Sequence, residues 1–211
     1  MDRPGLSPTR PMLKPNAPEP EGVIKFVLDF HPAESPDWML CAELDAWRSL
    51  LFKLGLTGQD PKRYGGLAYG NVSRRLGGTA FLISGTQTGA WPELHAEHYC
   101  IVDACAVSEN RITAHGPVQP SSEALTHAAV YRADARIQAV LHVHSPVLWT
   151  QAQALWLAIT DPSAAYGTPA MADAVSRLVG TGEARIIAMG GHQDGLLACG
   201  ASVTAAAMAL L

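Results

Sequence analysis

Charged side chains are scarce in this sequence, and the positive ones form no cluster. Asp, Glu, Lys and Arg make up 16% of the 211 residues, and the formal net charge is −4. A surface that binds nucleic acid needs clustered positive charge, so we expect none here. Hydrophobic residues reach 48%, which is typical of a globular chain and not of a disordered one. The low charge also indicates that part of the surface is buried in a homo-oligomer.

Long apolar runs and paired cysteines are lacking as well. No stretch is long enough to span a bilayer, and no apolar segment follows a basic start as it does in a secretory signal. We therefore expect a cytoplasmic protein with no membrane partner. Four cysteines lack disulfide-like or metal-binding spacing, which indicates small core residues in a reducing compartment: Cys41, Cys100, Cys105 and Cys199.

The chain divides into an N-terminal arm and a body. Six prolines fall within residues 1–21 with almost nothing apolar between them, which predicts an extended arm. Alternating apolar residues from Ile24 to Phe30 then predict a strand within residues 22–34. We expect a single domain that spans residues 22–211, with this strand as an N-terminal addition.

Helices and strands mix along the body without a regular β-α-β repeat, so we expect a mixed or antiparallel sheet between helices. Ser35 and Pro36 suit the start of a helix that ends before Gly55. Further helices are predicted at 124–131, 147–159, 169–179 and 201–211, and strands at 80–83, 98–105, 111–114, 137–144, 185–189 and 196–199.

Two histidines stand out on the apolar strand from Ile137 to His144. His142 and His144 are two residues apart, so their side chains share one face of the strand. Neutral imidazole is the commonest protein ligand for zinc-like cations. The pair is compatible with half of a metal site, although such a pair on a strand is more often two unrelated polar contacts.

Three further segments are rich in groups that bind anions. The loops at 65–75 and 84–89 combine Gly, Ser, Thr and Asn, which suits a phosphate but also ordinary hairpin turns. Ser121, Ser122 and Glu123 follow Pro120 at a helix start, where they cap the helix or face a ligand. His127 shares the helical face of Glu123.

Five of these motifs occur in an order that resembles the class II aldolase/adducin family, which includes aldolases and 4-epimerases of sugar phosphates. The resemblance covers about residues 38–211. The motifs are Gly70-Asn71-Val72-Ser73, Leu82-Ile83-Ser84-Gly85-Thr86-Gln87-Thr88-Gly89, Pro120-Ser121-Ser122-Glu123, His142-Val143-His144 and Gly191-His192-Gln193-Asp194-Gly195.

The resemblance implies an α/β fold of three α/β/α layers around a mostly antiparallel sheet. It also implies a homotetramer and a divalent metal held by three histidines, with Zn²⁺ preferred over Mn²⁺, Co²⁺, Fe²⁺ or Ni²⁺. His142 and His144 match two of the ligands. The third normally precedes a glycine, where this chain has Asp194. We expect His192 to be the third ligand, reached by a local two-residue shift. Asp194 is then a ligand or a neighbour of the ligands, and His127 is a neighbour of the ligands.

The resemblance further implies the chemistry. Glu123 matches the acid/base of the aldolases, where the epimerases typically have Asp. Five residues match the positions that bind the substrate phosphate: Asn71, Thr88, Gly89, Ser121 and Ser122. The chain is shorter than the aldolases between His144 and Tyr166, where they carry a tyrosine general acid, and the sequence offers no counterpart.

We therefore expect a metal-dependent aldolase-type lyase that acts on a small hydroxy-carbonyl substrate, such as a sugar or sugar phosphate, through a metal-stabilised enediolate. Two alternatives remain open. One is an adducin-like binding or assembly protein without catalysis, although such domains tend to lack the metal histidines. The other is an epimerase or decarboxylase on the same scaffold, since a fold does not fix a reaction.

Overall fold

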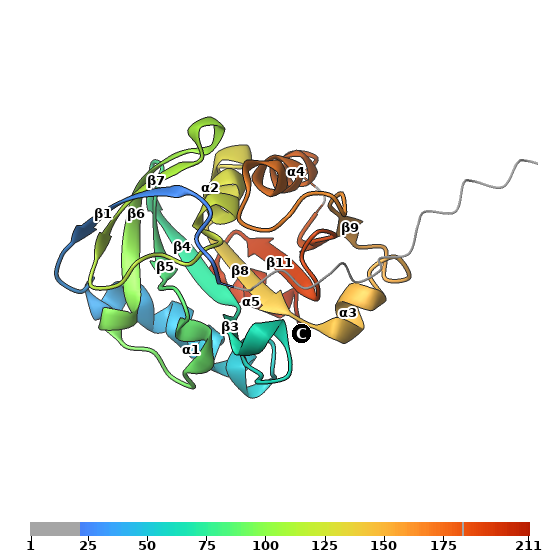
Figure 1. The fold of residues 1–211 in the computed structure, drawn as a ribbon, viewed down its shortest axis with the longest axis horizontal. Helices are drawn as coiled ribbons and strands as arrows, with labels where there is room; N and C mark the ends of the chain where they lie inside the picture. The colour runs from blue at the N-terminus through green and yellow to red at the C-terminus, as the bar shows by residue number, and fades with distance from the viewer. Residues whose placement is uncertain (1–21, 183) are drawn as a thin grey trace, which may run out of the picture.

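A sheet of nine strands forms the centre of the molecule, and the computed structural model describes it within residues 22–182 and 184–211 (Figure 1). Neighbouring strands are antiparallel except for the outermost pair at each end of the sheet. The order across the sheet is β1 (Val27–Pro32), β7 (Arg111–Gly116), β6 (Tyr99–Ala106), β5 (Ala80–Ser84), β4 (Asn71–Gly77), β8 (Ala139–His144), β11 (Gly195–Gly200), β10 (Ile186–Ala188) and β9 (Ala158–Ile159).

Helices cover both faces of this sheet. On one face, α2 (Ala124–Ala133) and α4 (Pro169–Gly180) pack in a core that includes Val140 of β8. On the other face, α1 (Trp38–Lys53) and α5 (Val203–Met208) pack in a core that includes Leu141 and Val143. The three-layer α/β/α fold with a mostly antiparallel sheet, in one domain, is thereby confirmed.

Strand β8 lies at the centre of the sheet, hydrogen-bonded to β4 on one side and to β11 on the other. All six of its residues are buried. Because Leu141 and Val143 point to the side of α1 and α5, strand alternation turns His142 and His144 to the side of α2 and α4. A short two-stranded sheet, β2 (Gly58–Gln59) and β3 (Ala68–Tyr69), lies near the end of β8 that carries His144.

The N-terminal strand forms at 27–32, slightly later than the alternation from Ile24 predicts. This β1 pairs in parallel with β7 at one edge of the sheet. The proline-rich arm, residues 1–21, lies outside the described residues. Within the described ranges, none of the helices is both long and apolar enough to cross a bilayer.

Four local predictions were wrong. Helix α1 is capped by Asp37, whose side chain accepts from Met39 N, and not by Ser35. The segment 71–77 is strand β4 and not a loop, because pairing with β5 and β8 outweighs the turn-forming residues in and before it. The predicted helix 147–159 is only α3 (Pro146–Thr150), since residues 158–159 pair with β10. The last helix begins at Val203, where Ser202 caps it, and ends at Met208.

Candidate metal centre

Three buried histidines come together at one end of β8. His142 and His144 extend from the strand itself, and His192 comes from the loop that joins β10 to β11. Their ligand nitrogens all lie within 4.8 Å of one another. The Nε2 atoms of His142 and His144 are 3.1 Å apart, and the rings of His142 and His192 stack at 4.9 Å. The structure thus brings His192 to the predicted pair.

Glycine at position 195 allows this approach. Gly195 pairs with His144 across the β8–β11 ladder. A Cβ atom at Gly195 would lie 3.0 Å from Cγ of His192 and 3.2 Å from Cε1 of His142. Since real Cβ contacts are rarely so short, any larger residue there would push the two rings apart.

Burial keeps the paired imidazoles neutral. Desolvation, followed by the nearby His192, holds the pKa of His142 and of His144 well below the ordinary histidine value. Nδ1 of His142 donates to the carbonyl oxygen of Leu196 at 3.1 Å. That bond fixes the tautomer in which Nε2 carries a lone pair, as is usual for a histidine that binds a metal.

This donor set fits a zinc-like cation. Zn–N bonds of about 2.0–2.1 Å in a tetrahedral site imply nitrogens about 3.3 Å apart, which is close to the 3.1 Å between the two Nε2 atoms. Three imidazole ligands leave at least one position of a tetrahedral ion for water or substrate, which is typical of a catalytic and not a structural site.

Glu123 lies directly beside the histidines. It is fully buried at the start of α2, and its Oε1 lies 3.4 Å from Nδ1 of His192. Its side chain makes no capping hydrogen bond to α2. The simple capping role considered from the sequence therefore does not account for this carboxylate.

His127 lies one helical turn after Glu123 and is completely buried. Its Nδ1 is 2.7 Å from Oγ of Ser73, which also contacts the Tyr131 hydroxyl at 2.7 Å. Desolvation lowers the pKa of His127 to about 3. Its charge also lowers the pKa of His142, so it lies near the ligands, while its own hydrogen bond goes to Ser73 of β4.

Three of the five predicted anion-binding residues border the cluster. Asn71 is the register partner of His142 on β4, so the two side chains lie on the same face of the sheet. Ser121 and Ser122 directly precede Glu123 and are buried. The Ser121 hydroxyl accepts from Glu123 N at 3.3 Å, so it also helps to fix the start of α2.

Thr88 and Gly89 lie in the loop after β5 and have structural roles of their own. The Thr88 hydroxyl donates to Gly85 O at 2.7 Å. A Cβ atom at Gly89 would lie 2.3 Å from Tyr69 O, so close packing against β3 requires glycine there. Buried Arg48 of α1 donates through Nη2 to the carbonyls of both residues, at 3.0 and 2.9 Å. These two hydrogen bonds fix the loop against α1.

The predicted residue Asp194 is not among the clustered donors, and its side chain bonds instead to the loop between β2 and β3. Its Oδ2 accepts hydrogen bonds from the Tyr64 hydroxyl at 2.7 Å and from Nη2 of Arg63 at 3.0 Å. The Tyr64 ring packs edge-on against His144, with centroids 4.6 Å apart. Sequence reasoning missed Arg63 and Tyr64. Only their place beside the glycine-rich passage gave a signal.

A second tyrosine borders the cluster on the side of His192. The rings of Tyr166 and His192 lie 4.8 Å apart. Nζ of Lys25 lies 3.9 Å from the centroid of the Tyr166 ring, and Val23 N donates to its hydroxyl at 3.3 Å. The segment before β1 therefore reaches the surroundings of the metal centre, which the sequence did not indicate.

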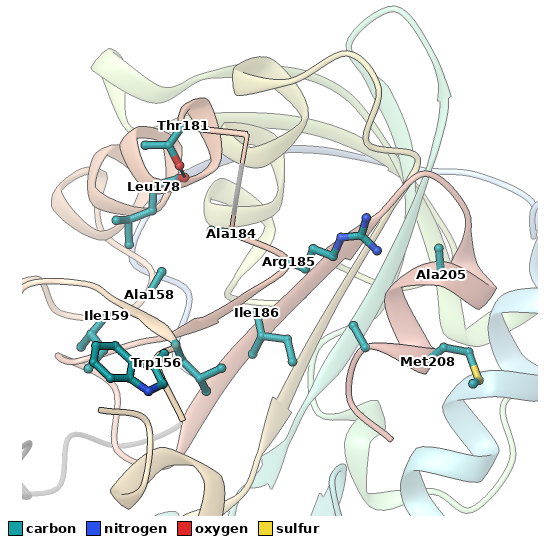
Figure 2. A pocket seen from close by; sticks show the side chains of 12 residues that line it. Trp156, Ala158, Ile159, Leu178, Thr181, Ala184, Arg185, Ile186, Ala205 and Met208 are labelled. Atoms are coloured by element: carbon teal, nitrogen blue, oxygen red, sulfur yellow. Dashed lines mark hydrogen bonds between the residues drawn. The ribbon is translucent and has the colours of Figure 1, made fainter. Parts of the chain in front are cut away.

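A separate hollow of about 790 Å³ lies at the opposite edge of the sheet from β1 (Figure 2). Trp156, Ile186 and Met208 are among its twelve lining residues, none of which is a histidine or an acid. Because it holds none of the groups described above, it is not part of the candidate centre.

The chain matches a known protein family over most of its length. The model of the family described as "Class II Aldolase and Adducin N-terminal domain" matches residues 61–211. A search of curated proteins finds no significant match.

Solved structures share the fold at low sequence identity. L-fuculose-1-phosphate aldolase from Thermus thermophilus is 21% identical over 80% of this chain and 86% of its own, with a TM-score of 0.61. Sugar-phosphate aldolase from Thermotoga maritima is 14% identical over 80% of this chain and 88% of its own, with a TM-score of 0.62. An aldolase II superfamily protein from Pseudomonas syringae is 22% identical over 82% of this chain and 71% of its own, with a TM-score of 0.55. At these identities the likeness shows the fold alone.

Proposed function

The chain belongs to the class II aldolase and adducin family, and on this premise we propose that it is a metal-dependent carbon–carbon lyase. Its substrate is a small hydroxy-carbonyl compound of the sugar or sugar-phosphate type. The observation that carries the proposal is the position of Glu123, whose Oε1 lies 3.4 Å from His192 in the group of three buried histidines. An acid/base thus adjoins a metal-binding donor set.

The three histidines hold the metal, for which we expect Zn²⁺. His142, His144 and His192 present nitrogen donors from a central strand and the loop before its neighbour, and the first two are held neutral by burial. When bound, a divalent cation polarises a carbonyl group and stabilises the negative charge that develops on its oxygen. The protein supplies the fixed positions of these buried donors.

Glu123 moves the proton at the carbon next to the carbonyl group. In the cleavage direction, the hydroxyl of the departing fragment gives up its proton to solvent and becomes an aldehyde as the carbon–carbon bond breaks, and the electron pair of that bond passes to the carbon next to the carbonyl group. The Glu123 carboxyl then delivers a proton to it, and in the direction of bond formation the carboxylate removes the same proton. Full burial holds the side chain in one orientation for both steps.

Polar groups beside the cluster orient the rest of the substrate. Asn71 lies opposite His142, and its buried Oδ1 has no hydrogen-bond partner within the described part of the chain. Ser121 and Ser122 present hydroxyls at the start of α2, where the helix dipole favours an anion. A phosphate or hydroxyl of the substrate would satisfy these groups. Thr88 and Gly89 complete the proposed phosphate-binding group, and Arg48 holds their loop after β5 in place.

The test is a retro-aldol screen of the metal-loaded protein with short keto- and aldo-sugars, each with and without a phosphate group. We expect metal-dependent release of an aldehyde from at least one compound. Proton exchange at the carbon next to the carbonyl, with no cleavage of any compound, would favour an epimerase or decarboxylase. Neither exchange nor cleavage by the metal-loaded protein would favour the adducin-like binding role.

A further inference from the structure

Arg63, Tyr64 and Asp194 form a hydrogen-bonded group on the His144 side of the cluster. Oδ2 of Asp194 accepts from the Tyr64 hydroxyl at 2.7 Å and from Nη2 of Arg63 at 3.0 Å. The same Nη2 also contacts the Tyr64 hydroxyl. The Asp194 side chain is 7% exposed and the Arg63 side chain 34%, so the carboxylate is shielded from solvent and the guanidinium is partly exposed. Bonds between such groups are stronger than their solvent-exposed equivalents.

The backbone at two of these residues is in an unfavourable conformation. Tyr64 has φ 51° and Asp194 has φ 64°, in the left-handed region that favours glycine. Such conformations persist only where their surroundings hold them, and they cluster at functional sites. Here two strained residues from segments 130 positions apart bond to each other through their side chains.

Both residues also contact the segment that carries His144. The Tyr64 ring meets the His144 ring at an interplanar angle of 72°, with centroids 4.6 Å apart. The carbonyl oxygen of Asp194 accepts from Ser145 N at 2.9 Å. A closed circuit of contacts results: His144 is bonded along the chain to Ser145, Ser145 N donates to Asp194, Asp194 accepts from Tyr64, and the Tyr64 ring packs on His144. The Tyr64 ring, held by Asp194, thereby restricts the His144 ring.

The Asp194 carboxylate is already used within this circuit. Its Oδ2 accepts two donors, and the group of metal-binding candidates in the described part of the chain contains the three histidines and not Asp194. The donors that lie close enough together to share a metal ion are therefore the three histidines.

We propose that Arg63, Tyr64 and Asp194 act as positioning residues for the metal centre, in which Asp194 fixes the His144 ring through Tyr64 without binding the metal. The inference rests on the proposed metal centre. It assigns a role to two residues of the loop between β2 and β3 that no motif of the sequence indicates. It also explains why an aspartate stands before Gly195.

The test measures Co²⁺ binding by the full chain in Tyr64→Phe and Asp194→Asn. Tyr64→Phe keeps the ring on His144 but removes the hydroxyl, and Asp194→Asn keeps the shape but removes the charge. Because partners that orient a ligand typically change metal affinity about ten- to a hundredfold, we expect a loss of that size in each variant. The visible Co²⁺ bands should keep their wild-type positions, since all three ligands remain.

Two reference variants complete the experiment. His192→Ala shows the effect of losing a ligand. Asp134→Asn removes another Arg–carboxylate pair, with Arg136 at the far end of α2 from Glu123, and should bind Co²⁺ like the wild type. If Asp194→Asn fails to fold, Tyr64→Phe decides.

Three results would overturn the proposal. Wild-type affinity in Tyr64→Phe would leave the group as a simple tether between loops. Shifted bands in Asp194→Asn but not in Tyr64→Phe would make Asp194 a ligand. Absence of Co²⁺ binding by the wild type would remove the proposed metal centre itself, whereas binding with unaffected variants removes only the positioning role.

Discussion

At the scale of single residues, a substitution of Glu123 tests whether this residue is catalytic or only structural. Glu123→Gln keeps the size of the side chain and removes its ability to exchange a proton. We expect the variant to retain its metal, because Glu123 is not one of the three donors. Exchange of the substrate proton with deuterated solvent, followed by NMR, should fall at least about a hundredfold. Exchange at the wild-type rate would leave Glu123 as part of the helix start only.

Buried His127 should make the stability of the metal-free protein depend on pH. Its pKa is lowered to about 3 in the folded chain, against roughly 6.5 when unfolded. Between these values the unfolded chain binds the proton and the folded chain does not. His127 therefore destabilises the fold progressively as the pH falls below about 6.5, by up to about 1.4 kcal/mol per pH unit.

The variant His127→Asn tests this at one position. Asparagine retains a hydrogen-bonding group near the place of Nδ1, which contacts Ser73. In urea titrations with chelator present, the slope of unfolding free energy against pH between 6.5 and 5 should decrease by roughly 1 kcal/mol per unit. An unchanged slope would mean that other groups carry the whole pH dependence.

At the scale of elements, helix α1 supports the loop that carries Thr88 and Gly89. Arg48→Met removes two hydrogen bonds to the carbonyls of that loop while filling much of the same space. We expect the free energy of unfolding to fall by roughly 1–3 kcal/mol. KM for a phosphorylated substrate should rise more than kcat falls, because the loop is displaced and Glu123 is not.

Arg136→Met is the matched control, since this arginine lies exposed on the surface in a pair with Asp134. It should change the free energy of unfolding by no more than about 0.5 kcal/mol. If Arg48→Met behaves in the same way, the buried arginine does not support the loop.

Elements with strong local patterns could be predicted from the sequence. Strand β8 and helix α4 follow directly from apolar runs and capping residues such as Thr168. The segment 147–159 could not, because its alanines and leucines favour a helix, whereas its end pairs with β10 far along the chain. Tertiary contacts outweighed intrinsic propensity there.

The same division applies to the candidate site. His142 and His144 share a strand face by simple alternation, and resemblance to a family directed attention to Glu123 and His192. Arg63 and Tyr64 could not be predicted, because their contacts with Asp194 link positions 131 and 130 residues apart. No local pattern encodes such a contact.

At the scale of the whole molecule, we expect several copies of the chain to assemble. The family resemblance implies a homotetramer. Large apolar side chains are exposed on the single chain, among them Trp156 at 93% and Val147 at 70%, as is common where subunits meet. Light scattering after size-exclusion chromatography should give four chains per particle. A monomer at micromolar concentration would contradict this prediction.

The metal content of the protein tests the central claim most directly. Protein purified without chelator should contain one divalent metal ion per chain by elemental analysis. His142→Ala and His192→Ala should each abolish it, because two imidazoles bind far more weakly than three. Wild-type protein without metal even after incubation with Zn²⁺, or His192→Ala with its metal retained, would contradict the account.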